Sequence, residues 1–112
     1  MNYGDIFWVD LPSPNGHEQS GHRPCIIFQD TAAFSLPTVL VIPLTTNEFV
    51  TRFPGVVVIQ PSPTNGLSAP SFALVFQLQV RDLRRVGNRI GALDAADLAA
   101  VQAMAKSVMR LP

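Results

Sequence analysis

The chain has little of what disulfide frameworks, metal sites and membrane spans are built from. It contains one cysteine, Cys25, in 112 residues, which excludes an internal disulfide and every cysteine-rich zinc site. No apolar run approaches the roughly 18 residues of a membrane-spanning helix, and no signal peptide is recognisable. We therefore expect a cytoplasmic protein with no membrane partner and no metal.

Charge is also scarce. Charged residues make up 14% of the chain, and eight basic residues balance eight acidic ones. Sequence-blind binding of a long polyanion depends on many phosphate contacts, which a neutral chain does not supply, although a local cluster can bind a short one. A surface so poor in charge also indicates that a partner, such as a second copy, covers part of it.

Apolar residues and turn formers are abundant. Hydrophobic residues account for 47% of the chain, alongside ten prolines and seven glycines. At this length the chain supports one hydrophobic core, so we expect a single domain over residues 1–112. The many turn residues favour short elements.

Short β-rich runs between turn clusters predict five or six strands. In the first, Ile6 and Trp8 face one way, and Phe7, Val9 and Leu11 the other. The predicted strands cover residues 4–12, 24–30, 37–46, 55–61 and 71–80, with a further short piece at 89–93.

Two prolines limit how these strands pair. Because proline has no N–H to donate to a ladder, we expect Pro24 to begin its strand. For the same reason Pro43 predicts an edge or a bulge within the third strand.

In the last part of the chain the apolar residues recur with the spacing of a helix. Asp94 is a predicted N-cap, and Asp97 stands three residues later, where a capping box has its acid. The spacing predicts one helix within residues 94–111, with an apolar stripe of Leu98, Val101, Ala105 and Val108.

These elements predict a mainly β fold, a small and strongly bent antiparallel sheet or partial barrel closed by a C-terminal helix. There is no alternation of strands and helices, which argues against a parallel sheet.

The polar stretch GHEQSGHRP, residues 16–24, carries groups capable of chemistry. Arg23 precedes Pro24, which disfavours helical geometry and aims the arginine off the mouth of the strand. Its planar fork suits a phosphate or a carboxylate. The alternative is an exposed arginine that pairs with Glu18 or Asp30. His17 and His22 bracket the stretch as proton carriers or as solvated histidines.

Hydroxyls end the third strand at Thr45 and Thr46. Such groups can donate to a phosphoryl oxygen or position a ribose 2′-OH, or they can bond a turn. Residues 81–89 hold four arginines, which form either a local positive patch or a solvated turn in which Arg81 or Arg84 pairs with Asp82.

Serine-nucleophile, P-loop and zinc-protease motifs are absent from the sequence, as is a carboxylate cluster suited to Mg²⁺. The remaining groups are arginine, hydroxyl and imidazole. Cleavage of an RNA phosphodiester fits them, because the substrate supplies its own nucleophile, the 2′-OH. The protein then needs proton transfer and a cation for the phosphorane.

In order along the chain, several segments resemble the MazF/PemK (Kid) family of toxin–antitoxin endoribonucleases. They are GDIFW at the start, EQSGHRP in the polar stretch and PLT at the end of the third strand. Gln77, Arg85 and the glycine–leucine pair at Gly91 and Leu93 complete the frame.

This resemblance implies an SH3-like barrel of five strands with a C-terminal helix, assembled as a homodimer. It implies metal-independent cleavage of single-stranded RNA at a short sequence, leaving a 2′,3′-cyclic phosphate and a 5′-OH. It also implies a cognate antitoxin whose extended, acidic tail occupies the RNA groove.

The same resemblance assigns roles to residues. Arg23 becomes the phosphorane-stabilising cation and a proton donor, Thr45 holds a phosphate oxygen or the 2′-OH, and His17 is an optional base or substrate contact. RNA contacts are expected from Glu18, Gln19, His22, Thr46, Gln77, Arg81 and Arg85.

The chain departs from the Kid branch at three positions. Leu74 and Phe76 replace an arginine and an aspartate, and Gln79 replaces a frequent basic residue. Two alternatives therefore stay open: a protein-binding toxin such as the gyrase-poisoning CcdB relatives, and a catalytically inactive RNA-binding relative.

Overall fold

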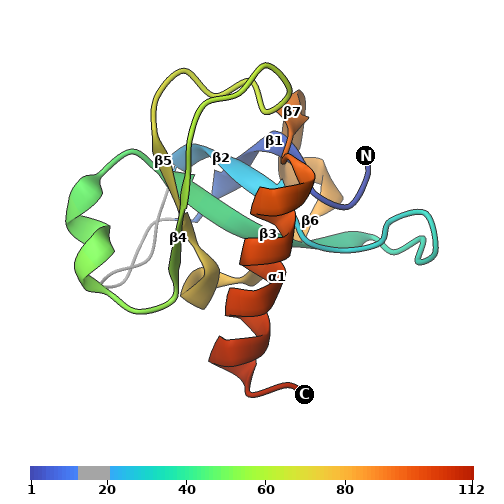
Figure 1. Ribbon diagram of the computed structural model, residues 1–112. Helices are drawn as coiled ribbons and strands as arrows, with labels where there is room; N and C mark the ends of the chain where they lie inside the picture. Colours follow the sequence, from blue (N-terminus) through green and yellow to red (C-terminus); the bar gives the residue numbers. More distant parts are fainter. Residues whose placement is uncertain (13–20) are drawn as a thin grey trace.

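The computed structural model describes residues 1–12 and 21–112. A bent antiparallel sheet is crossed by one α-helix (Figure 1). The elements, in chain order, are β1 (Asp5–Leu11), β2 (Gly21–Ile27), β3 (Thr38–Thr45), the 3-10 helix η1 (Glu48–Arg52), β4 (Val56–Ile59), β5 (Ser71–Leu74), η2 (Val75–Gln77), β6 (Gln79–Asp82), η3 (Leu83–Arg85), β7 (Val86–Ala92) and α1 (Ala95–Met109).

The strands follow the order β4–β5–β3–β2–β1–β7, and β6 also pairs with β3. Every strand pair in the described part of the chain is antiparallel. The predicted mainly β class with a C-terminal helix is confirmed. Within the described residues no helix combines the length and apolarity needed to cross a bilayer.

The strand predicted over 71–80 is wrong as a single element. Its first part is β5, which pairs with Leu44 and Thr45, and its last part lies in β6, which pairs with residues 38–41 of β3. The 3-10 turn η2 separates them. This division also explains why the described residues form seven strands rather than five or six.

The same switch of partners accommodates Pro43. β3 as a whole is an interior strand rather than an edge, but its pairing is interrupted on one side at Pro43. On the other side Pro43 pairs with Cys25 of β2. On the interrupted side, the ladder with β6 reaches along β3 only to Val41, and the ladder with β5 begins at Leu44. The proline therefore lies in the gap between two ladders, where a missing N–H removes no strand bond.

Pro24 is the fourth residue of β2 and not its first, as we expected. β2 pairs with β1 from Gly21 to Ile26 but with β3 only from Cys25 onward. At Pro24 the strand thus has a neighbour on one side only. The last predicted strand is likewise longer, since β7 begins at Val86.

Two core clusters lie on opposite faces of β1 and β2. Ile6 belongs to the cluster that Val101 and Ala105 of α1 cover, whereas Val9 and Leu11 belong to the second cluster. The predicted alternation along the first strand is therefore confirmed. It follows that packing of Val101 and Ala105 against the sheet stabilises α1.

Asp94 occupies the predicted N-cap position with extended backbone, but no side-chain cap bond forms, so the capping box is wrong. The Asp94 carboxylate instead accepts a hydrogen bond from the Thr64 hydroxyl. This bond ties the start of α1 to the loop between β4 and β5, residues 60–70, which forms one wall of the pocket described next.

Candidate functional site

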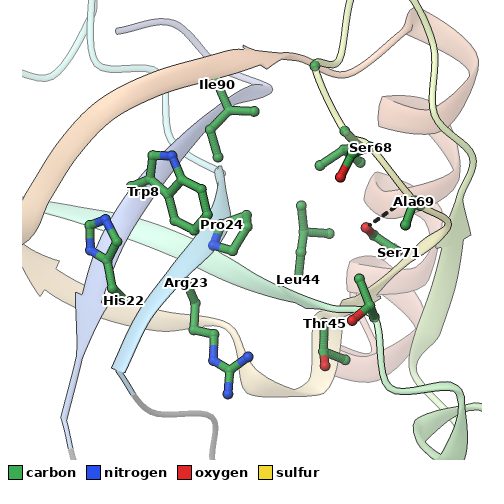
Figure 2. A pocket seen from close by; sticks show the side chains of 13 residues that line it. Trp8, His22, Arg23, Pro24, Leu44, Thr45, Ser68, Ala69, Ser71 and Ile90 are labelled. Carbon is green, nitrogen blue, oxygen red and sulfur yellow. Dashed lines mark hydrogen bonds between the residues drawn. The ribbon is translucent and has the colours of Figure 1, made fainter.

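One pocket opens where β1, β2 and β3 face the β4–β5 loop (Figure 2), with a volume of about 290 Å³. Four of the residues proposed from the sequence lie in it: Arg23, Thr45, His22 and Thr46. The full lining is Trp8, His22, Arg23, Pro24, Leu44, Thr45, Thr46, Gly66, Leu67, Ser68, Ala69, Ser71 and Ile90.

Arg23 reaches this pocket from β2, two residues before the β3 ladder begins at Cys25. It pairs with Val9 of β1 and is exposed. Figure 2 shows its guanidinium at the same end of the pocket as Thr45. An arginine fork at this position can bind two oxygens of one phosphate.

Thr45 is the last residue of β3 and is only 7% exposed. Its Oγ1 accepts a hydrogen bond of 3.2 Å from the backbone N–H of Asn47. Because a hydroxyl has one proton to give and two lone pairs, this contact leaves the Thr45 proton for a ligand. Thr46, next in the chain, is exposed at the same edge.

His22 lies against Trp8 and Asp10. Its ring stacks on the Trp8 indole with centroids 4.9 Å apart and planes 7° apart. Its Nδ1 is 2.9 Å from Asp10 Oδ1. The two contacts fix the ring's position and orientation, so His22 is held in place at the pocket rim.

Three predicted residues, His17, Glu18 and Gln19, lie outside the described residues.

Arg81 and Arg85 are not in the pocket. They line a second depression of about 360 Å³ with Asp10, Leu11, Pro12 and Asp82. The pocket and this second depression are linked by one contact: Asp10, which lines the depression, lies 2.9 Å from His22, which lines the pocket. Gln77 lines neither; it is half-buried at the end of η2, and its carbonyl accepts from the Gln79 side chain.

The arginines of residues 81–89 have different partners. Arg84 pairs with Asp82 at 3.0 Å, as one alternative predicted, and Arg89 lies 3.5 Å from the buried Asp5. Arg81 donates to the Gln79 side chain. The fourth, Arg85, lines the second depression together with Arg81.

Cys25 is a buried structural thiol and not a nucleophile at the surface. Burial raises its pKa to about 12, and the nearby Arg81 guanidinium offsets part of that rise. A thiol in this state is protonated and unreactive at neutral pH.

The sequence did not indicate the far wall of the pocket. Gly66, Leu67, Ser68 and Ala69 come from the β4–β5 loop, whose serines, glycine and prolines carry only a turn signal. Trp8, which the alternation predicts on the same face as Ile6, is 36% exposed whereas Ile6 is fully buried.

A family model for the PemK-like, MazF-like toxin of type II toxin–antitoxin systems matches residues 2–109. The chain belongs to this family. Endoribonuclease MazF of Staphylococcus saprophyticus is 33% identical over 91 residues, which cover 80% of this chain and 75% of that protein. Endoribonuclease MazF6 of Mycobacterium tuberculosis is 27% identical over 98 residues, covering 86% and 85%.

Solved structures of family members share the fold. MazF from Deinococcus radiodurans superimposes with a TM-score of 0.80 at 23% identity, covering 98% of this chain and 96% of that one. A MazE–MazF complex from the same organism gives a TM-score of 0.76 at 23% identity, covering 100% and 97%.

The departures from the Kid branch lie away from the pocket. Leu74 is fully buried beside Val50 and Phe72. Phe76, in η2, contacts Phe53 with ring centroids 5.9 Å apart. Neither residue lines the pocket that contains Arg23 and Thr45.

Proposed function

We propose that this toxin is a sequence-specific endoribonuclease that cleaves single-stranded RNA without a metal. One observation carries the proposal: Arg23 and Thr45, from neighbouring strands, line one pocket. The relatives named endoribonuclease support the class of reaction. The products we expect are a 2′,3′-cyclic phosphate and a 5′-OH.

In the proposed reaction the ribose 2′-oxygen attacks the adjacent phosphorus and loses its proton, and the 5′-oxygen leaves and gains one. The Arg23 guanidinium binds the non-bridging oxygens, whose charge grows in the phosphorane, and so stabilises the transition state more than the ground state. Arg23 is also the proposed donor to the leaving oxygen.

Thr45 is proposed to hold the reacting groups in line. Its hydroxyl already accepts from the Asn47 N–H and therefore offers its proton to a phosphate oxygen or its free lone pair to the 2′-OH. His17, which lies outside the described residues, stays the proposed base on the family resemblance.

We propose two protein partners. The first is a cognate antitoxin with an extended acidic tail, supported by the MazE–MazF complexes among the solved relatives. The second is another copy of the chain. An apolar groove between η2 and the end of α1 supports dimerisation; it is lined by Val75, Phe76, Leu78, Ala105, Val108 and Met109. We also propose that the toxin acts in the cytoplasm, because its proposed substrate is mRNA.

The experiment uses a long defined RNA in EDTA. The proposal expects discrete fragments whose ends carry 2′,3′-cyclic phosphate and 5′-OH groups. Activity that requires a divalent cation, or products with a 5′-phosphate, contradicts it. Growth arrest without RNA cleavage favours a protein-binding toxin, and RNA binding without cleavage favours an inactive relative.

A further inference from the structure

The pocket is larger than a phosphate site needs, and much of its lining is apolar. Arg23 and Thr45 occupy one end (Figure 2). The remainder, which we call the base slot, is bounded by Trp8, Pro24, Leu44, Leu67 and Ile90. Apolar walls of this kind favour a flat, weakly polar ligand over an ion.

We propose that the base slot binds one nucleobase of the RNA, next to the scissile phosphate, by stacking on Trp8. This inference rests on the proposed function, because it takes the ligand of the adjoining Arg23–Thr45 site to be RNA. The inference names Trp8 as a side chain through which the toxin binds its substrate and in part selects it.

Trp8 is suited to this role by its exposure and by its neighbours. It is 36% exposed, although Ile6 and Val9 on the same strand are fully buried. His22 covers one side of the indole, and Asp10 anchors His22. Figure 2 shows Pro24 and Leu44 on the side of the indole away from His22, where a base can complete a stack of three rings.

The opposite wall has a fixed shape. Asn65, in the β4–β5 loop, is 0% exposed; its Oδ1 accepts from the N–H groups of Ser62 and Leu67, and its Nδ2 donates to the Gln60 carbonyl. A Cβ at Gly66 would lie 2.3 Å from the Ile90 carbonyl oxygen, so the loop packs directly on β7. The slot is therefore preformed and loses little entropy on binding.

Ser68 supplies a polar group at the edge of the slot. Within the described residues its hydroxyl has no hydrogen bond, whereas the Ser71 hydroxyl already donates to the Ala69 carbonyl at 3.1 Å. A hydroxyl at this edge can bond to a donor or an acceptor on a base. We therefore assign Ser68 as a specificity-determining residue.

The test uses Trp8 itself, because it is the only tryptophan in the chain and its emission reports on the slot. Short 2′-deoxyoligonucleotides serve as probes, since without a 2′-OH they cannot be cleaved by the proposed route. An oligonucleotide of equal length with abasic sites is the matched control. Anisotropy of a dye on each probe measures binding separately from the emission.

The expected result is quenching of Trp8 by the base-containing probe and none by the abasic probe at full occupancy. Trp8→Ala should weaken binding of the base-containing probe by about 5- to 100-fold, and Trp8→Phe much less, because alanine loses the stacking ring. Ser68→Ala should lower the preference among the four homopolymers by about 2- to 10-fold. The exposed Ser35, outside the pocket, provides the control Ser35→Ala.

Unchanged Trp8 emission with bound probe, or equal quenching by the abasic probe, overturns the base slot. Absence of binding to any probe overturns it as well. These outcomes are distinguishable from failure of the proposed function. If the toxin cleaves RNA but Trp8 emission does not change, the proposed function is supported and the base slot is contradicted. If Trp8 is quenched but RNA is not cleaved, the base slot is supported and the nuclease function is contradicted.

Discussion

Arg23 and Thr45 lie at the same end of the β2–β3 pair, each two residues beyond the last pair of the ladder, Cys25 and Pro43. Because the strands are antiparallel, one residue precedes that pair and the other follows it. Both line one pocket. The pocket thus lies where β2 and β3 stop pairing with each other, next to buried residues of both strands that hold the backbone.

Replacement of the Thr45 hydroxyl should slow RNA cleavage with little effect on folding. Thr45→Val keeps the branched shape, and Thr45→Ser keeps the hydroxyl. We expect single-turnover cleavage by Thr45→Val to fall about 10²-fold, as for loss of one preorganised donor, while Thr45→Ser stays within a few-fold of the parent. Equal rates for Thr45→Val and the parent protein would remove Thr45 from the mechanism.

Asn65 should be a large contributor to stability through the pocket wall. Asn65→Ala removes the side-chain partner of three part-buried backbone groups, the N–H groups of Ser62 and Leu67 and the carbonyl of Gln60. We expect the free energy of unfolding, measured in urea, to fall by about 1–3 kcal/mol. The control Asn88→Ala, on the exposed face of β7, should change it by less than about 0.5 kcal/mol. A similar small change for both variants contradicts the assigned role.

The sequence predicts those parts of the fold in which apolar residues repeat with a regular spacing. Alternation placed Ile6 and Val9 on opposite faces, and the helical spacing located α1. The spacing did not predict that residues 71–80 divide into two strands, because the two parts are equally apolar. They differ only in the part of β3 with which they pair.

The site was predicted in part for a related reason. The start of β2 and the residues Ser68 and Ala69 are polar or small, so they give no periodic signal. Arg23 and Thr45 could be selected because proline and a strand end mark their positions. Only the fold shows that a distant loop faces them and that Trp8 lines the same pocket.

Alkaline pH should destabilise the toxin through Cys25. Its pKa is about 12 in the folded protein, raised from an ordinary value of 9.0, so above pH 9 the unfolded chain loses the proton first. A raised folded pKa gives stability that is complete below the unfolded value and is lost as pH rises. Between about pH 8 and 10 we expect a loss of about 1.4 kcal/mol that Cys25→Ala does not show. Parallel pH profiles for both proteins contradict this.

Acid pH should weaken the link between the β4–β5 loop and α1. The Thr64 and Ser62 hydroxyls hold the pKa of Asp94 below its usual value. A lowered folded pKa contributes stability that is present above the unfolded pKa and is lost as pH falls through the folded one. Thr64→Val should therefore be less stable than the parent near pH 7, and the gap should narrow at about pH 3. Thr64→Ser, which keeps the hydroxyl, should follow the parent; a gap independent of pH argues against the carboxylate.

The central claim is that the Arg23 guanidinium stabilises charge on the scissile phosphate. The most direct measurement is the single-turnover rate of cleavage of one defined single-stranded RNA in EDTA, for the parent protein and Arg23→Ala, with circular dichroism to confirm equal folding. We predict a loss of at least about 2.7 kcal/mol, about 10²-fold in rate. A folded Arg23→Ala that cleaves at the parent rate contradicts the account.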